Sequence, residues 1–154
     1  MDAASLLRGR SRETAIRRDG GGRWFLGDAP IEHPGVSRSF AGWIDRSEDG
    51  RLCLRNAIDW AYIEIEGPPY FVESLWIDAG EVWLRLSGGL EERLLPETLR
   101  EGEDLSLWCS VREARLAARF ENHASVALAP LLDEDAGGAY LRIGGSVIRP
   151  PTTA

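Results

Sequence analysis

The sequence contains no lysine, one methionine, two histidines and two cysteines. All 18 positively charged residues are therefore arginines, whose guanidinium group can hold phosphate or carboxylate through two nitrogens. A GC-rich coding sequence would give the same composition, and we prefer that explanation. Two cysteines, Cys53 and Cys109, are too few for a disulfide-stabilised secreted scaffold. Each lies in an apparent strand, and we expect buried, reduced thiols.

Long apolar runs and catalytic signatures are also missing. No stretch approaches the ~20 apolar residues of a membrane-spanning helix, and the N-terminus has no apolar signal region, which predicts a soluble, cytoplasmic protein. The sequence has no nucleophile elbow, phosphate-binding loop, zinc-binding HExxH or dinucleotide-binding glycine motif. The net charge of −7 argues against non-specific binding to nucleic acid or to an anionic membrane. It leaves room for a small anionic ligand held by a few arginines.

The chain is organised around Trp60–Val72. Ile63 and Ile65 alternate with Glu64 and Glu66, which predicts a strand with one buried and one solvated face. A Gly-Pro-Pro break follows, and a second strand begins at Tyr70, because neither proline can donate to a sheet. With 154 residues and 44% apolar residues, the chain suffices for one domain or two small ones. We place a boundary at this break.

The N-terminal part predicts a flexible arm over 1–22 and an α+β unit over 23–67. In that unit, strands at 24–26 and 29–32 form a hairpin through Gly27-Asp28. A helix starts at Pro34, with Val36, Phe40, Trp43 and Ile44 on its apolar stripe. A loop over 45–50 and a strand over 51–55 complete it.

The C-terminal part predicts a second α+β unit over 68–149 and a loose tail over 150–154. Antiparallel strands at 70–77, 81–86, 90–95 and 105–111 follow one another, with a polar connection over 96–104. A hairpin through Arg112-Glu113, a helix capped by Asn122, a loop over 133–138 and a strand over 139–143 repeat the order of the first unit. We therefore expect a duplicated α+β fold with mostly antiparallel sheets. Pro130 conflicts with a long helix at this position.

Few residues stand out as chemical candidates. His33 and His123, with Glu32 and Glu121, could form a metal or acid–base site, but helix capping or partial exposure is the simpler interpretation. Asp59, Glu64 and Glu66 could act as paired carboxylates; the solvated face of a strand accounts for the two glutamates more simply. Arg115 and Arg119 are candidates for binding an anion, or simply outward-facing. Most of the six tryptophans should belong to the core, and one or two could stack on a flat ligand.

The chain resembles the bacterial family of domain of unknown function 1285 (DUF1285). The stretches that carry the resemblance are IRRDG at 16–20, WFLGDAPI at 24–31, RLCLRNAID at 51–59, IEIEGPPYFV at 63–72 and ARLAARF at 114–120. The resemblance implies a duplicated α+β structure whose C-terminal half is similar to a pleckstrin-homology fold. It also implies a nucleotide-type ligand at the domain interface and a role in signalling, with no established enzymatic activity. The chain has His33, Asp59 and Gly67 where the family tends to have arginine, glutamate and aspartate.

These observations predict a non-enzymatic ligand-binding or sensing module with a site between its two halves. The residues expected to form this site are Trp24, His33, Asp59, Glu66, Arg115 and Arg119. Aromatic rings would stack on the ligand, arginines would neutralise its anionic part, and carboxylates would accept its donor hydrogens. Two alternatives stay open: a protein-interaction or homodimerisation module, and a metal-dependent hydrolase. The sequence identifies no cofactor.

Overall fold

The computed structural model describes residues 2–8 and 12–152, which fall into two compact units. Unit 1 is Met1–Pro69 and unit 2 is Tyr70–Ala154. The division follows the Gly-Pro-Pro break, where Gly67 has a φ of +85°, a left-handed conformation that favours glycine. The predicted boundary, between residues 67 and 68, lies two residues earlier.

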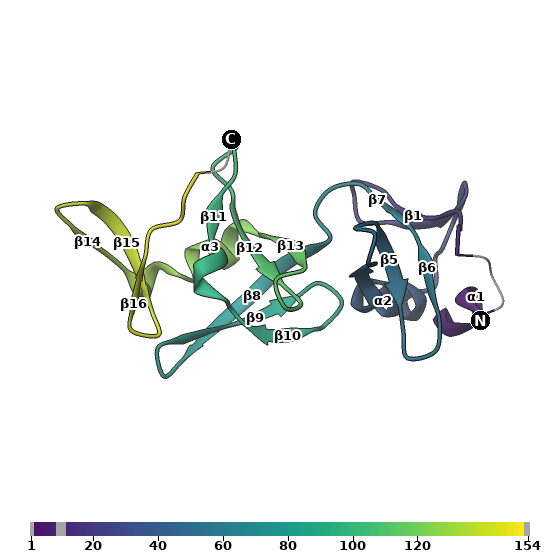
Figure 1. Ribbon diagram of the computed structural model, residues 1–154, viewed down its shortest axis with the longest axis horizontal. Helices are drawn as coiled ribbons and strands as arrows, with labels where there is room; N and C mark the ends of the chain where they lie inside the picture. Colours follow the sequence, from purple (N-terminus) through teal and green to yellow (C-terminus); the bar gives the residue numbers. More distant parts are fainter. Residues whose placement is uncertain (1, 9–11, 153–154) are drawn as a thin grey trace. The chain divides into compact units, whose positions relative to one another are not determined.

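Unit 1 contains two small sheets and a helix of ten residues (Figure 1). Its elements are α1 Ala3–Leu7, β1 Ile16–Arg18, β2 Trp24–Leu26, β3 Ala29–Pro30, α2 Pro34–Trp43, β4 Ile44–Arg46, β5 Leu52–Arg55, β6 Trp60–Tyr62 and β7 Glu64–Ile65. The sheets have the strand orders β3-β2-β1-β7 and β4-β5-β6. Helix α2 packs on β5 and on α1.

Helix α2 forms where the sequence predicts it. Pro34 occupies the first turn, and Val36 and Phe40, one turn apart, are 1% and 0% exposed. The predicted apolar stripe continued into Ile44, but the helix ends at Trp43 and Ile44 begins β4. The predicted loop over 45–50 is therefore wrong for Asp45 and Arg46, which pair with β5. Successive Ile44 and Asp45 side chains are both buried, so this strand lacks the alternation by which strands are recognised.

Unit 2 contains a six-stranded sheet with the order β10-β9-β8-β13-β12-β11 and a three-stranded sheet with the order β14-β15-β16. Its elements are β8 Tyr70–Asp78, β9 Glu81–Leu86, β10 Glu91–Arg93, the 3-10 helix η1 Pro96–Thr98, β11 Arg100–Glu101, β12 Leu107–Val111, β13 Leu116–Phe120, α3 Asn122–Val126, the 3-10 helix η2 Ala129–Leu131, β14 Leu132–Asp135, β15 Gly138–Ile143 and β16 Ser146–Ile148. One face of the large sheet is a core, in which the side chains of Tyr70, Val72, Leu84, Leu86, Cys109 and Ala118 are 0% exposed.

Most strand pairs in both units are antiparallel; β1 with β7 and β13 with β8 are parallel. The predicted α+β class with mostly antiparallel sheets is confirmed. In unit 1 a hairpin, a helix and a three-stranded sheet follow one another, and β12-β13, α3 and β14-β15-β16 repeat that order in unit 2. Both cysteines are free and buried, as predicted.

Several segments predicted as irregular are ordered. The expected flexible arm over 1–22 includes α1 and β1, and Leu7 and Ile16 are buried; residues 1 and 9–11 lie outside the described part. The polar connection over 96–104 contains η1 and β11. In the predicted tail, the Pro151 carbonyl accepts the Glu101 amide at 2.8 Å, which ties residues 150–152 to β11, while 153 and 154 are not described.

The second helix differs most from its prediction. Asn122 is the first residue of α3 and not its cap; Glu121 precedes the helix without a side-chain capping bond. The helix ends at Val126, and Pro130 lies in the first turn of η2, so the proline interrupts no helix. The predicted loop over 133–138 is also wrong, because 132–135 form strand β14, which pairs with β15.

Candidate functional site

The six residues expected to bind a ligand are divided between the two units. Unit 1 contains Trp24, His33, Asp59 and Glu66, and unit 2 contains Arg115 and Arg119. A single site that uses both groups stays a prediction. We therefore describe the surroundings of each residue within its own unit.

Trp24 belongs to the core of unit 1. Its side chain is 4% exposed and packs edge-to-face on Phe40, with ring centroids 5.3 Å apart. The same residue lines a surface pocket of about 490 Å³ together with Pro30 and Glu32. The burial of the ring is what the core interpretation of the tryptophans predicts.

His33 caps helix α2. Its Nδ1 accepts hydrogen bonds from the backbone N–H groups of Gly35 at 3.1 Å and of Val36 at 3.4 Å. These amides are among those that a helix leaves without an intrahelical partner at its N-terminus. The capping interpretation of His33 is confirmed, and the imidazole acts here as a hydrogen-bond acceptor.

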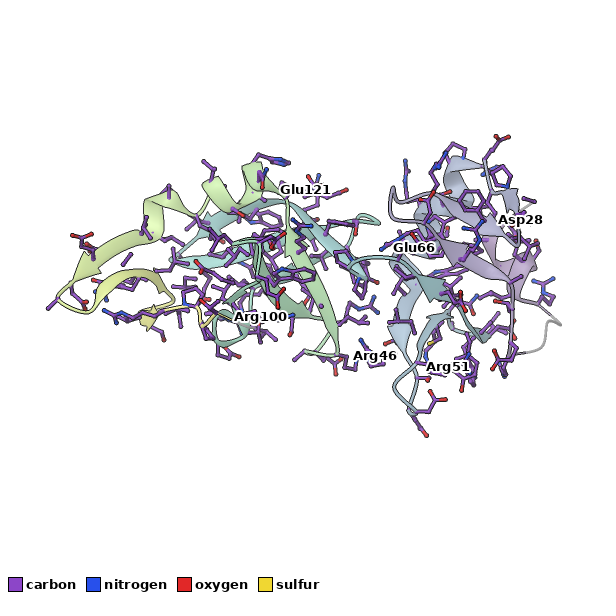
Figure 2. All side chains as sticks on the ribbon, turned by 90° about the horizontal axis from the view of Figure 1, so that it is seen from above. Asp28, Arg46, Arg51, Glu66, Arg100 and Glu121 are labelled. Carbon is purple, nitrogen blue, oxygen red and sulfur yellow. The ribbon has the colours of Figure 1, made fainter. Side chains whose placement is uncertain are left out.

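Asp59 and Glu66 lie at turns of unit 1. The Asp59 amide donates to Asn56 Oδ1 at 2.7 Å, in the turn between β5 and β6. Glu66 Oε2 accepts from the Gly20 amide at 3.0 Å. Glu66 also lines a pocket of about 450 Å³ with Arg17 and Arg51, and Figure 2 shows the side chains of Arg51 and Glu66 on this unit.

Arg119 lies in a row of side chains that crosses four strands of unit 2. The register pairs Arg100 of β11 with Trp108 of β12, Trp108 with Arg119 of β13, and Arg119 with Phe71 of β8. Residues directly opposite one another point to the same face of a sheet. All four are half-buried, and they alternate with core residues along β12 and β13. We call the face that carries this row the open face.

The open face alternates cations with aromatic rings. The guanidinium carbon of Arg100 lies 5.7 Å from the centroid of the Trp108 ring, within the range of a cation–π contact. Trp108 and Phe71 flank Arg119 on the neighbouring strands. An aromatic ring next to an arginine can stack on a flat ligand while the arginine binds its anionic group.

A hydrogen-bond network joins Arg119 to Trp108 through the turn between β11 and β12. Arg119 Nη2 donates to Asp104 Oδ2 at 2.8 Å. The Ser106 hydroxyl donates to Asp104 Oδ1 and accepts from Trp108 Nε1, the latter at 2.8 Å. Gly102 makes room for this arrangement, since a Cβ there would lie 2.8 Å from Trp108 Nε1. The network orients both the tryptophan ring and the arginine.

Asp104 stays ionised in this network. The bond from the Ser106 hydroxyl lowers the pKa of the Asp104 carboxyl most, and the Ser106 amide and the charge of Arg119 lower it further. The carboxylate and Arg119 are both partly exposed, with side-chain exposures of 58% and 41%. An exposed ion pair contributes little to stability, so a competing anion can take the place of Asp104 on Arg119 at small cost.

Arg115 is held by the turn that precedes β13. Arg112, Glu113 and Ala114 have φ values of 54°, 61° and 62°, which non-glycine residues adopt rarely. Arg115 Nε donates to the Arg112 carbonyl at 3.0 Å. The side chain is exposed, and by strand alternation it precedes buried Leu116 on the side of the open face. Arg115 is therefore a second cation near the open face.

Sequence reasoning identified Arg115 and Arg119 but not Phe71, Arg100, Asp104 and Trp108. Trp108 and Arg119 each alternate with apolar residues that face the core, and this period-two pattern places them on the opposite face. The row itself depends on the register of four strands, including the parallel pairing of β13 with β8. No local pattern specifies that register.

Within 2–8 and 12–152, no three residues among histidine, cysteine, aspartate and glutamate form a group able to hold a metal ion. His123 Nε2 lies 3.7 Å from Glu121 Oε2 and contacts the Glu73 carbonyl. In the same part of the chain, no helix is long and apolar enough to cross a membrane.

Comparison with solved structures shows which fold this is. A crystal structure of a DUF1285 family protein from Silicibacter pomeroyi DSS-3 has a TM-score of 0.70 and 18% identity, over 95% of this chain and 85% of that one. A DUF1285 family protein from Shewanella baltica OS155 has a TM-score of 0.60 and 12% identity, over 78% of this chain and 94% of that one. No protein-family model and no curated protein matches the chain. The resemblance to DUF1285 proteins is thus confirmed as a shared fold.

Proposed function

We propose that this protein is a non-enzymatic ligand-binding module, with a sensing role in signalling. Its open face binds a flat ligand that carries an anionic group, such as a nucleotide. The observation that carries the proposal is the row Arg100–Trp108–Arg119–Phe71 across four strands. Aromatic rings and guanidinium groups in alternation match both parts of such a ligand, the flat base and the phosphate.

Each side chain has a distinct task in this proposal. Trp108 is oriented by Ser106 and stacks on the base. Arg119 binds the phosphate after exchanging its ion pair with Asp104, and Arg115 adds a second positive charge. Asp104, once released, accepts hydrogen bonds from donor groups of the ligand. The expected contributions of Trp24, His33, Asp59 and Glu66 remain part of the hypothesis and are tested separately by substitution.

The first experiment is a thermal-shift screen of the purified protein against nucleotides and nucleotide-derived cofactors. A ligand that binds only the folded protein stabilises it by about 2.7 kcal/mol at a hundred times its dissociation constant. Calorimetric titration of each hit with Arg119→Ala should then show binding weakened at least tenfold. Arg119→Lys should retain only part of the affinity, because lysine lacks the planar fork.

A matched control is available on another strand of the same sheet. Arg85 forms an exposed ion pair with Glu91 at 3.2 Å, comparable to the pair of Arg119 with Asp104, but Arg85 lies outside the row. Arg85→Ala should leave binding unchanged. Asp104→Asn should tighten binding of a phosphate-bearing hit, because the competing carboxylate is removed while Ser106 keeps an acceptor.

The proposal fails if every hit binds equally well to wild type, Arg119→Ala and Trp108→Ala. If no nucleotide shifts the melting temperature of the folded protein, the result favours the alternative of a protein-interaction module. The mass of the protein in light scattering at increasing concentration would then test for a homodimer.

A further inference from the structure

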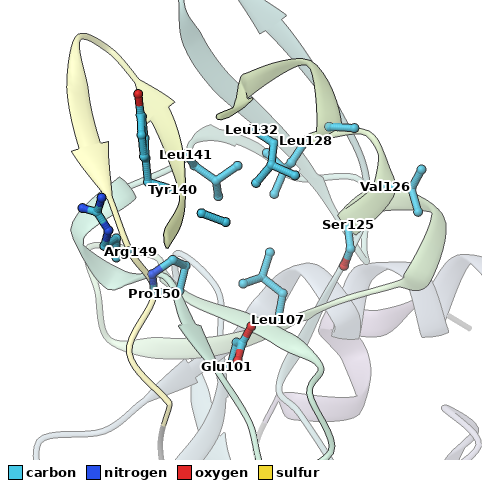
Figure 3. A pocket seen from close by; sticks show the side chains of 12 residues that line it. Glu101, Leu107, Ser125, Val126, Leu128, Leu132, Tyr140, Leu141, Arg149 and Pro150 are labelled. Atoms are coloured by element: carbon cyan, nitrogen blue, oxygen red, sulfur yellow. The ribbon is translucent and has the colours of Figure 1, made fainter. Parts of the chain in front are cut away.

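Unit 2 contains a pocket of about 470 Å³ that the open face does not use. It is lined mainly by apolar residues, four of them leucines (Figure 3). Leu128 belongs to the segment from α3 to η2, Leu132 and Leu141 to the small sheet, and Leu107 to β12. Leu107 precedes Trp108 and so faces away from the open face. The pocket is therefore separate from the site proposed for a flat anionic ligand.

The rim of this pocket exposes large apolar side chains to water. Val126 is 71% exposed and Leu132 is 58% exposed, while Leu128 and Leu141 below them are buried. In Figure 3 the side chains of Leu128, Leu132 and Leu141 converge on the pocket. Exposed apolar side chains gathered around a hollow are typical of a surface that binds another apolar group.

Strand β14 forms one border of the pocket and ends its sheet. The order of that sheet is β14-β15-β16, and all four residues of β14 are exposed. The Glu134 amide donates to Asp133 Oδ1 at 2.8 Å, so a side chain takes up this N–H. A partner strand can replace that side chain, as occurs when extended peptides add to a sheet edge.

The charge of this edge selects the kind of peptide. Asp133, Glu134 and Asp135 follow one another along β14, and Glu101 lines the pocket. Arg149 binds Asp135, which leaves the edge with an excess of negative charge. A second copy of the chain paired edge to edge would place the same carboxylates against each other, which like-charge repulsion disfavours.

We propose that the pocket and β14 together bind an extended, basic peptide segment of a partner protein. One leucine-like side chain of the peptide enters the pocket beside Leu132. Arginine or lysine residues on the two faces of the peptide lie opposite Asp133 and Glu134, and the peptide backbone continues the sheet beyond β14. This surface is independent of Arg119 and of the ligand proposed for the open face.

Fluorescence anisotropy with a labelled Arg-Arg-Leu-Arg-Arg peptide tests this proposal on the full chain. Two comparison peptides replace the leucine by serine, or all four arginines by glutamate. Binding of the first peptide should be at least tenfold tighter than binding of either other peptide. Ala139→Trp, which fills the pocket from an exposed position, should weaken binding tenfold or more.

Two further variants separate the pocket from the charge. Leu132→Ser should weaken binding of the leucine peptide and leave binding of the serine peptide unchanged. Leu105→Ser, at a leucine that is 76% exposed and lies outside the pocket, should change neither. The double variant Asp133→Asn, Glu134→Gln should weaken binding of both peptides that carry arginines, the leucine peptide and the serine peptide. Circular dichroism confirms that each variant is folded.

Several outcomes would overturn the proposal. One is binding that is unchanged in the serine peptide, in Leu132→Ser and in Ala139→Trp and that is lost at high salt. Such binding would come from charge attraction alone. Another is no binding of the leucine peptide at millimolar concentration. A third is occupancy by something else: a concentration-dependent dimer that Leu132→Ser abolishes, or a small apolar molecule that binds the pocket while the peptide does not.

Discussion

Helices α2 and α3 each follow a hairpin and precede a three-stranded sheet, yet they differ in length and in the side chains they bury. Helix α2 has ten residues and buries Val36 and Phe40 completely, with Trp24 packed against Phe40. Helix α3 has five residues, and the chain turns into η2 after it. A pocket of about 470 Å³ remains beside α3 and η2.

The comparison shows that the longer helix buries larger side chains than the shorter one. In unit 1 a helix of ten residues buries Val36 and Phe40, and a surface pocket of about 490 Å³ lies beside Trp24. In unit 2 a helix of five residues buries Ala124, the buried Leu128 follows it, and Pro130 disfavours a longer helix. The same order of elements thus yields a longer core helix in one unit and, in the other, the pocket that we propose as a peptide-binding surface.

The largest expected difference between the two units is in the reactivity of their buried cysteine thiols. Burial raises the pKa of the Cys109 thiol in unit 2 to about 12 from an ordinary value of 9.0. This reduces the thiolate fraction about 1,000-fold. Burial also raises the pKa of the Cys53 thiol in unit 1, but the charge of Arg55 opposes the shift.

With a thiol reagent at pH 8, both cysteines should be nearly unreactive in the folded protein, and Cys109 should be the slower. The single variants Cys53→Ala and Cys109→Ala assign each rate, and denaturant supplies the unprotected rate. A fast reaction of Cys109 without denaturant would contradict the closed large-sheet core described here.

Truncation of the core of unit 1 should have the next largest effect. Phe40→Ala removes a ring that is 0% exposed and should lower the free energy of unfolding by about 3–5 kcal/mol. Leu132→Ala, at the 58% exposed rim of the pocket in unit 2, should change it by about 0.5 kcal/mol or less. Denaturant titration followed by tryptophan fluorescence measures both. Equal losses would abolish the distinction between closed core and open pocket.

The capping of the two helices offers a finer comparison. His33 accepts two amide hydrogen bonds, whereas Glu121 makes no side-chain capping bond to α3. His33→Ala should therefore cost about 1 kcal/mol of unfolding free energy, and His33→Asn should restore most of it. Glu121→Ala, at the equivalent position of α3, should have almost no effect. A loss at Glu121 as large as that at His33 would refute this difference between the caps.

The comparison of the helices also explains what the sequence could predict. Helix α2 carries local signals in Pro34, the capping histidine and apolar residues one turn apart, and its predicted end at Ile44 lies one residue beyond the observed end. The hairpin of β8 and β9 was found through Asp78-Ala79-Gly80. Strand β14 was missed, because its residues Leu-Asp-Glu-Asp are all exposed and so lack the apolar alternation of a half-buried strand.

The candidate site was predictable only in part, for a related reason. Arg119 could be identified as an arginine of the second predicted hairpin, where an anion-binding or an outward-facing role was expected. The neighbours of Arg119 come from strands far apart in the chain: Phe71 lies on β8, and Asp104 lies in the turn before β12. Tertiary pairing, which local sequence does not encode, brings these residues together. In contrast, the contacts of His33 lie within three residues of it and could be expected from the sequence.

The smallest expected effect is on the pH dependence of stability. It comes from two carboxyl groups with lowered pKa values, Asp49 in unit 1 and Asp104 in unit 2. Hydrogen bonds from the Ser47 and Tyr62 hydroxyls and from the Arg51 amide lower the pKa of Asp49 to about 2, from an ordinary 3.8. The pKa of Asp104 in unit 2 is lowered as well. A carboxyl whose pKa is lower in the folded protein than in the unfolded chain stabilises the fold fully above the unfolded pKa. That contribution is lost as the pH falls from about 4 towards 2.

Denaturant unfolding of wild type and Asp49→Asn between pH 5 and pH 2 should therefore give different slopes, with the variant losing less stability on acidification. Tyr62→Phe removes one of the hydroxyl donors, the bond of 2.7 Å to Asp49 Oδ2, and should give an intermediate slope. Asp104→Asn serves as the comparison in unit 2 and should flatten the slope as well. Because both carboxylates are exposed, these differences should be small. Identical slopes for wild type and Asp49→Asn would show that the hydroxyl bonds do not favour the ionised form.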